Sequence, residues 1–185
     1  MNLPNMLLVL RIVLIPVFMF FFLNAGPGED MFRLIAIIVY LIASISDFFD
    51  GYLARKWNQV SNFGKMMDPL ADKMLVSAAL IALVYRHELS AWVVTIIICR
   101  EFWVTALRLL ALEQGKEIIS ASTWGKIKTM LQMTMIAVLM TGMGTEELFG
   151  QVGTIIATVL VYLAVIATVV SAIEYTKNHR MVFKA

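Results

Sequence analysis

Six stretches of mostly apolar residues constrain the fold of this 185-residue sequence more than any other feature. A helix needs about 20 largely apolar residues to cross a bilayer, where every backbone polar group must be paired within the protein. The composition agrees, because 61% of the residues are hydrophobic and the mean hydropathy is +0.84. The stretches cover residues 6–22, 31–46, 67–85, 89–112, 127–143 and 152–173. We therefore expect an all-α membrane protein with six transmembrane helices, forming a single integral-membrane domain over residues 1–185.

The charges in the connecting segments alternate and predict an orientation. Residues 24–30, 86–90 and 144–150 are acidic or nearly neutral, whereas residues 54–65, 113–128 and 174–185 carry lysine and arginine. Basic connections stay on the cytoplasmic side of a membrane. We therefore expect both termini in the cytoplasm of a multi-pass protein. The first stretch is not typical of a cleaved signal peptide, because it lacks a basic leading region and contains Arg11.

Net charge and cysteine content exclude some classes of function. A formal net charge of +2 does not indicate a nucleic-acid partner. The single cysteine, Cys99, allows neither a disulfide framework nor a cysteine-type metal site. The polar residues within or beside the apolar stretches are therefore the best indication of function.

Four aspartates follow the second apolar stretch or begin the third. Asp47 and Asp50 are three residues apart, and Asp68 and Asp72 are four apart, so each pair shares one face of a helix. Antiparallel packing of the two helices would bring the four carboxylates together. Pro69 disfavours helical geometry at the residue before it, so the third helix is expected to start or bend there.

Four such carboxylates require counter-charges. Desolvation and mutual repulsion would cost several kcal/mol each without them. A set of oxygen ligands without histidine or cysteine suits Mg²⁺, Mn²⁺ or Ca²⁺. Gly51 and Ala54 place small side chains on the same face, and Arg55 offers a bidentate donor to a phosphate. A solvated acidic loop is the simpler alternative, but the helical spacing favours a diphosphate site at the membrane surface.

The complete pattern resembles the signature of the CDP-alcohol phosphatidyltransferase family. The matching positions, in chain order, are Asp47, Asp50, Gly51, Ala54, Arg55, Gly64, Asp68 and Asp72. The length and the six apolar stretches are similar to that family as well. The resemblance implies an enzyme that transfers a phosphatidyl group from CDP-diacylglycerol to an alcohol and releases CMP. It also implies a homodimer in the bacterial inner membrane, with the active site facing the cytoplasm.

The resemblance also implies roles for individual residues. Asp47, Asp50, Asp68 and Asp72 match the ligands of two divalent cations, Mg²⁺ or Mn²⁺. Asp72 further matches the general base that takes the proton of the acceptor hydroxyl. The residues that match contacts to the CDP-lipid are Arg11, Gly51, Ala54, Arg55 and Ser61. Leu8 stands where many relatives have threonine, so no role is assigned to position 8.

A second set of charged residues bears on the acceptor. Arg100, Glu101 and Arg108 interrupt the fourth apolar stretch, and Lys126 and Lys128 begin the fifth. Cations within a span are candidates for function, and together they would bind an acceptor that carries a phosphate. Two alternatives remain open. The lysines could be anchors at the membrane surface, and Arg100 with Glu101 could be a structural ion pair.

The same region resembles the phosphatidylglycerophosphate synthase subgroup, whose acceptor is sn-glycerol 3-phosphate. The matching positions are Arg100, Glu101, Leu107, Arg108, Gly115, Ser122, Gly125, Lys126, Lys128, Thr129 and Gln132. We expect Arg100, Arg108 and Lys126 to hold the acceptor phosphate. A sister transferase that uses inositol phosphate is the alternative, and a divalent-cation transporter is a more remote one that leaves Gly51 and Arg55 unexplained.

Overall fold

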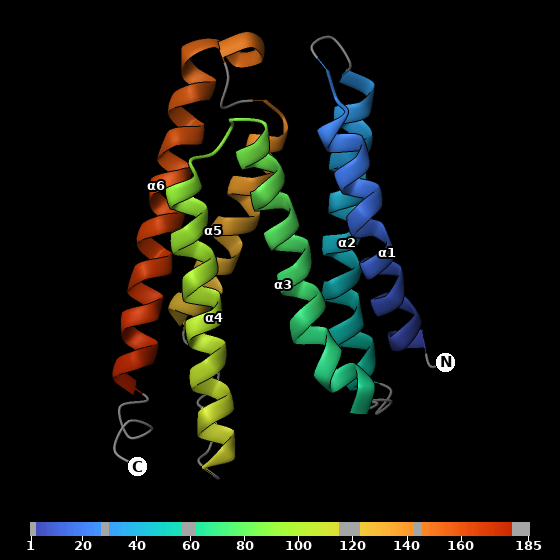
Figure 1. The fold of residues 1–185 in the computed structure, drawn as a ribbon, viewed down its shortest axis with the longest axis vertical. Coiled ribbons are helices and arrows are strands. Elements are labelled where there is room, and N and C mark those ends of the chain that lie inside the picture. The colour runs from blue at the N-terminus through green and yellow to red at the C-terminus, as the bar shows by residue number, and fades with distance from the viewer. Residues whose placement is uncertain (1–2, 27–29, 57–61, 115–122, 143–145, 179–185) are drawn as a thin grey trace. The chain divides into compact units, whose positions relative to one another are not determined.

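The computed structural model contains six α-helices, and no strand occurs among the residues that it describes (Figure 1). These residues are 3–26, 30–56, 62–114, 123–142 and 146–178, and for residues 47–56 and 62–72 the description is of the backbone alone. The helices are α1 (Leu3–Leu23), α2 (Asp30–Lys56), α3 (Asn62–Tyr85), α4 (Ala91–Glu113), α5 (Thr123–Met140) and α6 (Glu146–Asn178). The expected all-α class and the place of each helix are confirmed.

The ends of the helices differ from the apolar stretches in instructive ways. α2 continues to Lys56, ten residues beyond the end of its apolar stretch. Its last part therefore contains Asp47 and Asp50, the first half of the acidic motif that the four aspartates form. α3 begins at Asn62, and helix continues through Pro69. The third helix therefore does not start at the proline. Nearly two turns before the proline, residues 62–68, already belong to it.

The chain forms two compact units, Met1–His87 and Glu88–Ala185. The first unit contains α1, α2 and α3, and the second contains α4, α5 and α6. Within each unit the chain reverses direction from one helix to the next, as Figure 1 shows. Each unit is described separately below.

In the first unit α1 packs against both α2 and α3. Phe18 is at the centre of this packing, since its ring lies 5.7 Å from that of Phe22 and 5.9 Å from that of Tyr40. On either side of Tyr40, the buried side chains of α2 are small, since Ala36 and Ala43 are both fully buried. Small residues let helix backbones approach closely, which is how helices gain packing energy in lipid.

The end of α1 is fixed by an arginine from the end of α3. Arg86 Nη1 donates hydrogen bonds to the carbonyl oxygens of Phe22, at 3.2 Å, and Ala25, at 2.5 Å. Its guanidinium also lies 5.2 Å from the centroid of the Phe22 ring. The last carbonyls of a helix have no partner within it, so Arg86 supplies donors that α1 itself lacks.

In the second unit α6 packs against α4 and α5. Val104 and Leu107 of α4 form a buried cluster with Tyr175 of α6. Trp103 Nε1 donates a hydrogen bond to Thr176 Oγ1 at 3.0 Å. Residue numbers rise together along these two helices, so α4 and α6 run parallel, as two helices separated by one antiparallel helix must.

One helix in the described part of the chain, Gly150–Asn178 within α6, is long and apolar enough to cross a membrane by length and composition. Only 28% of its most apolar window is buried, which suits a helix that faces lipid better than the core helix of a soluble protein. Gly150 itself has φ 56°, in the left-handed region that favours glycine, and it separates the first turn of α6 from this span. The six-helix fold is therefore established, and six membrane crossings remain a prediction.

Candidate functional site

The first half of the acidic motif continues the buried row of α2. Ala36, Tyr40 and Ala43 are each no more than 1% exposed and recur every three or four residues. Because α2 is one helix to Lys56, the same spacing leads through position 47 to positions 50, 51 and 54. Asp47, Asp50, Gly51 and Ala54 therefore occupy the register of the helix face that packs inside the unit.

The second half of the motif relates to α3 in the same way. Leu75, Ala79 and Ala82 are no more than 1% exposed. Counting back along the continuous helix in steps of three and four gives positions 72 and 68. Both aspartate pairs thus share a register with the interior rows of two helices that contact each other.

The remaining donor-side predictions fall in different places. Arg11 lies on α1 and is only 1% exposed, among the most completely buried large side chains of the chain. Such burial of a cation is expensive, so it favours a functional role. Arg55 lies on α2, in the part described by its backbone, and Ser61 lies outside the described residues. Side chains with described positions include no group of three or more metal-ligating residues.

On the acceptor side, three helices meet at a buried ion-pair network. Glu101 of α4 accepts a hydrogen bond from Arg100 Nη1 at 2.9 Å and pairs with Lys128 Nζ of α5. Arg100 Nη2 donates to the hydroxyl oxygen of Ser171 on α6. The Arg100 and Lys128 side chains are 11% and 6% exposed. Two cations therefore share one carboxylate in a largely buried position, so the described charges of this network sum to +1.

Arg108 belongs to a separate contact two turns further along α4. Its guanidinium lies 5.6 Å from the centroid of the Tyr175 ring, and its Nε donates to the Tyr175 hydroxyl at 3.3 Å. Tyr175 is buried, while Arg108 remains exposed. The tyrosine thus orients an arginine that solvent or a ligand can still reach.

The two lysines at the start of α5 lie on different faces. Lys126 is exposed, whereas Lys128 is 5% exposed and pairs with Glu101. Two residues along a helix differ by about 200° in direction, so the pair cannot share one surface. Of the three residues expected at the acceptor phosphate, the structure brings Arg100 into the network, holds Arg108 against Tyr175, and leaves Lys126 on the outside.

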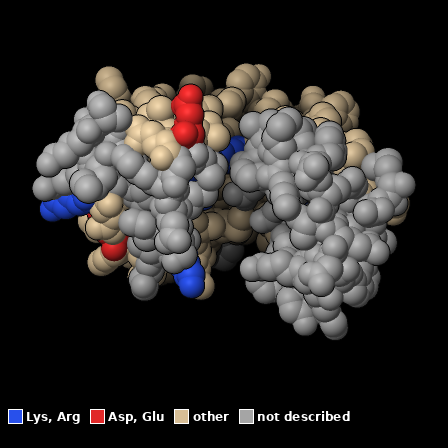
Figure 2. All heavy atoms as spheres, turned by 90° about the horizontal axis from the view of Figure 1, so that it is seen from below, with Lys and Arg blue, Asp and Glu red and all other residues tan. Residues whose placement is uncertain are grey.

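Figure 2 shows described lysine, arginine, aspartate and glutamate side chains as a few coloured spots among other residues.

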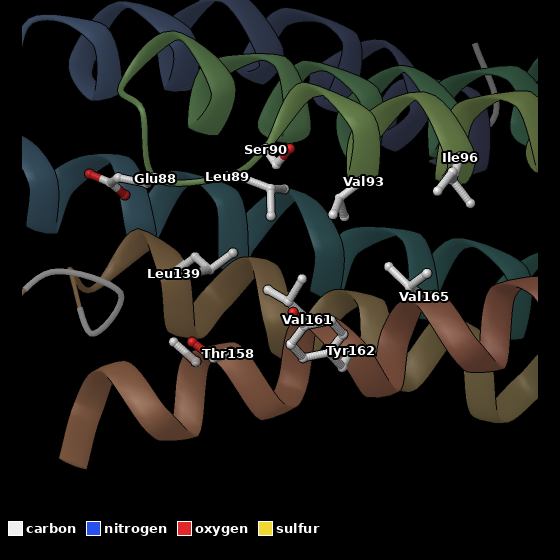
Figure 3. A pocket seen from close by; sticks show the side chains of 11 residues that line it. Glu88, Leu89, Ser90, Val93, Ile96, Leu139, Thr158, Val161, Tyr162 and Val165 are labelled. Carbon is white, nitrogen blue, oxygen red and sulfur yellow. The ribbon is translucent and has the colours of Figure 1, made fainter. Parts of the chain in front are cut away.

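An open pocket of about 440 Å³ occupies another part of the second unit (Figure 3). Its lining comes from the segment before α4, from the first turns of α4, from α5 and from α6, and consists of Glu88, Leu89, Ser90, Val93, Ile96, Leu139, Ala157, Thr158, Val161, Tyr162 and Val165. Figure 3 shows Val93 and Ile96 on α4 facing Val161 and Val165 on α6. No lysine or arginine is among these described lining residues, so the pocket does not suit a phosphate.

Comparison with known proteins decides between the families that such a site could serve. The profile of the CDP-alcohol phosphatidyltransferase family matches residues 1–170, which cover the first unit and most of the second. The chain belongs to this family. It is 44% identical, over 96% of its own length and 95% of the relative, to the CDP-diacylglycerol--glycerol-3-phosphate 3-phosphatidyltransferase of Bacillus subtilis.

Other members of the family give the same result. The proteins of that name from Rickettsia bellii and Haemophilus influenzae are both 36% identical to the chain. The matches cover 98% and 94% of this chain and 97% and 91% of the relatives. The resemblance seen in the sequence motif is thereby confirmed over nearly the whole length.

Sequence reasoning missed several residues of the acceptor-side network. Ser171 and Tyr175 come from α6, about 70 residues after their partners, in a helix whose surroundings are apolar. Lys128 was among the cations expected to bind a phosphorylated acceptor but was not one of the three named for its phosphate, and Gln132 was part of the recognised pattern without an assigned role. These two residues are four apart and therefore share one face of α5, and this spacing of two polar residues in an apolar helix is the signal that could have identified them.

Proposed function

We propose that the chain transfers the phosphatidyl group of CDP-diacylglycerol to sn-glycerol 3-phosphate, giving phosphatidylglycerol phosphate and CMP. The observation that carries the proposal is the 44% identity, over almost the full length of both chains, to a relative named for this reaction. The complete aspartate motif supports the donor half of the reaction, and the excess positive charge around Glu101 supports a phosphorylated acceptor.

The proposed setting is the bacterial inner membrane, with residues 1–185 acting as one integral-membrane domain. Six crossings with both termini in the cytoplasm are supported by the charge alternation of the connections. Large apolar side chains are exposed on helices of both units, for example Phe20 at 61% and Met130 at 74%. Tyr85 and Trp92 are exposed near the end of α3 and the start of α4, where an aromatic belt would lie.

Asp47, Asp50, Asp68 and Asp72 would hold two divalent cations, Mg²⁺ or Mn²⁺. The donor set fits, because it offers carboxylate oxygens alone, at positions that continue the interior rows of α2 and α3. Two bound ions of this kind neutralise a diphosphate and align the attacking and leaving oxygens of an in-line displacement.

The residues of the chain itself would bind and orient the substrates. Arg55 suits a bidentate contact to the diphosphate, and the missing or small side chains at Gly51 and Ala54 allow close approach to the α2 backbone. Arg11 and Ser61 complete the proposed contacts to the CDP-lipid. In the reaction a hydroxyl oxygen of the acceptor bonds to the β-phosphorus, the bond from that phosphorus to the oxygen of CMP breaks, and Asp72 accepts the hydroxyl proton.

The acceptor phosphate would bind to Arg100, Arg108 and Lys126. Support comes from Arg100, which carries part of the excess positive charge in the buried network, and from Arg108, which Tyr175 orients. Lys128 offers a further cation in the same network. If all six helices cross the membrane, successive connections lie on alternating sides of it. The α2–α3 connection beside the aspartates and the α4–α5 connection beside the basic residues would then lie on the same side.

A purified preparation in detergent, supplied with CDP-diacylglycerol and Mg²⁺, provides the test. CMP release should require sn-glycerol 3-phosphate, and label from that acceptor should enter a lipid. Release with inositol phosphate in its place would favour the sister transferase. If no acceptor gave metal-dependent CMP release, the transferase proposal would be contradicted, and a divalent-cation transporter would become the better explanation of the aspartates. The expected homodimer can be checked on the same sample by its mass in the micelle.

A further inference from the structure

Beside the four members of the network around Glu101, α5 carries one more buried polar residue on the helix face of Lys128. Gln132 lies one turn after Lys128 on α5 and is 3% exposed. We use the term polar cluster for Arg100, Glu101, Lys128, Gln132 and Ser171. The cluster draws on α4, α5 and α6, all within the second unit.

Most buried polar side chains of this unit have an identified partner. Lys128 donates to Glu101, the Ser171 hydroxyl oxygen accepts from Arg100, and the Thr168 hydroxyl donates to the carbonyl oxygen of Ala164. Gln132 differs from these, because its Oε1 is buried and accepts no hydrogen bond from any described residue. Arg100 Nε is likewise buried without an acceptor.

Buried polar atoms in native proteins are nearly always hydrogen-bonded, so an exception needs an explanation. Counted over its five members the cluster has a net charge of +1, and among the described residues Arg100 Nε has no acceptor and Gln132 Oε1 has no donor. An anion satisfies the charge and the donor, but it has no hydrogen to give to Gln132 Oε1. A hydroxyl group supplies that hydrogen. A small molecule that carries both a phosphate and a hydroxyl would satisfy the charge, the donor and the acceptor together.

We propose that Gln132 is a specificity-determining residue that accepts a hydrogen bond from the secondary hydroxyl of the acceptor. This inference rests on the proposed function and adds to it a residue that recognises the secondary hydroxyl of the acceptor. A site whose buried polar group is built to pair with a hydroxyl discriminates against an analogue that lacks the hydroxyl, because the group is then left unpaired. An acceptor without that hydroxyl should therefore be a poor substrate.

The experiment compares two acceptors on the full-length protein in detergent. 3-Hydroxypropyl phosphate keeps the phosphate and the attacking primary hydroxyl of sn-glycerol 3-phosphate and lacks the secondary hydroxyl. We expect the unaltered protein to prefer glycerol phosphate in kcat/KM by roughly tenfold, as one neutral hydrogen bond would give. In Gln132→Met, which is similar in size but cannot accept from a hydroxyl in this way, the preference should fall to near one.

Two further variants make the result interpretable. Thr134→Val is the matched control, since Thr134 is exposed on the same helix and bonds its own backbone. It should keep the full preference. Gln132→Glu retains acceptor oxygens but cancels the excess charge, so it should weaken both acceptors and preserve their ratio.

Specific outcomes would overturn the inference. They are equal use of both acceptors by the unaltered protein, an unchanged preference in a folded Gln132→Met, or a lost preference in Gln132→Glu. Failure of the unaltered protein to use glycerol phosphate at all would instead refute the proposed function. If Gln132→Met does not fold, the unaltered protein and Gln132→Glu still decide the question.

Discussion

Replacement of Glu101 by glutamine is expected to destabilise the protein substantially, because two largely buried cations pair with this one carboxylate. Arg100 is 2.9 Å from Glu101 Oε1, Lys128 pairs with the same oxygen, and both cations are at most 11% exposed. Removing one member of a buried ion pair costs about 3–5 kcal/mol. Since the Glu101 side chain keeps 21% exposure, we expect a loss of about 2–3 kcal/mol in the free energy of unfolding.

The measurement is denaturant unfolding in detergent micelles, followed by far-UV circular dichroism. Glu113→Gln makes the same chemical change at an exposed position near the end of α4 and should lie within about 0.5 kcal/mol of the parent. A double-mutant cycle with Lys128→Met isolates the pair. In the Lys128→Met background, Glu101→Gln removes the carboxylate from one cation instead of two. The coupling energy between the two substitutions should therefore be about 1 kcal/mol or more.

Two results would refute this reasoning. The first is a Glu101→Gln variant as stable as the parent, which would mean that solvent compensates both cations. The second is strict additivity in the cycle, which would mean that Glu101 and Lys128 do not interact in the folded protein.

Further changes probe the other contacts. Arg86→Met should lower the free energy of unfolding by about 2 kcal/mol, since two carbonyls at the end of α1 lose a charged donor, and Arg86→Lys should recover only part. Gly150→Ala should cost about 1 kcal/mol through its positive φ alone, because nothing within 4 Å would meet the added Cβ; an unchanged unfolding midpoint would argue against that backbone. Tyr175→Leu should raise the KM for glycerol phosphate more than the KM for the lipid, and Tyr175→Phe, which keeps the ring under Arg108, should raise it less. Chelation by EDTA should abolish CMP release and Mg²⁺ or Mn²⁺ should restore it, whereas Asp72→Asn should stay inactive at any cation concentration and still bind CDP-lipid.

The helices were predictable from sequence for a simple physical reason. Each apolar stretch has the length and hydropathy typical of a helix that crosses a membrane, so its class and approximate place follow directly. The end points were less predictable. α2 runs to Lys56 because the acidic motif keeps helical spacing after the apolar residues stop, and a hydropathy pattern does not register that.

The candidate site was predictable only in part. The aspartate spacing is local and therefore visible along the chain, and it identified the family correctly. The choice of Lys126 over Lys128 depended on which face of α5 turns inward, and two nearby lysines give no local signal of that. The partnerships of Arg100 with Ser171 and Arg108 with Tyr175 are tertiary contacts between distant segments. The sequence around isolated polar residues in the apolar helix α6 does not predict which residues of α4 they contact.

The continuity of α2 also fixes a depth. Asp47 lies seventeen residues after the first residue of the helix, Asp30, and a rise of about 1.5 Å per residue separates them by roughly 26 Å. That distance is close to the thickness of the hydrocarbon layer, about 30 Å. If α2 crosses the bilayer as proposed, its length places Asp47 near one membrane surface, at the level where the diphosphate of a lipid would lie. A single residue inserted between Ala43 and Asp47 would move the aspartates by about 1.5 Å and turn them by about 100°, out of register with α3.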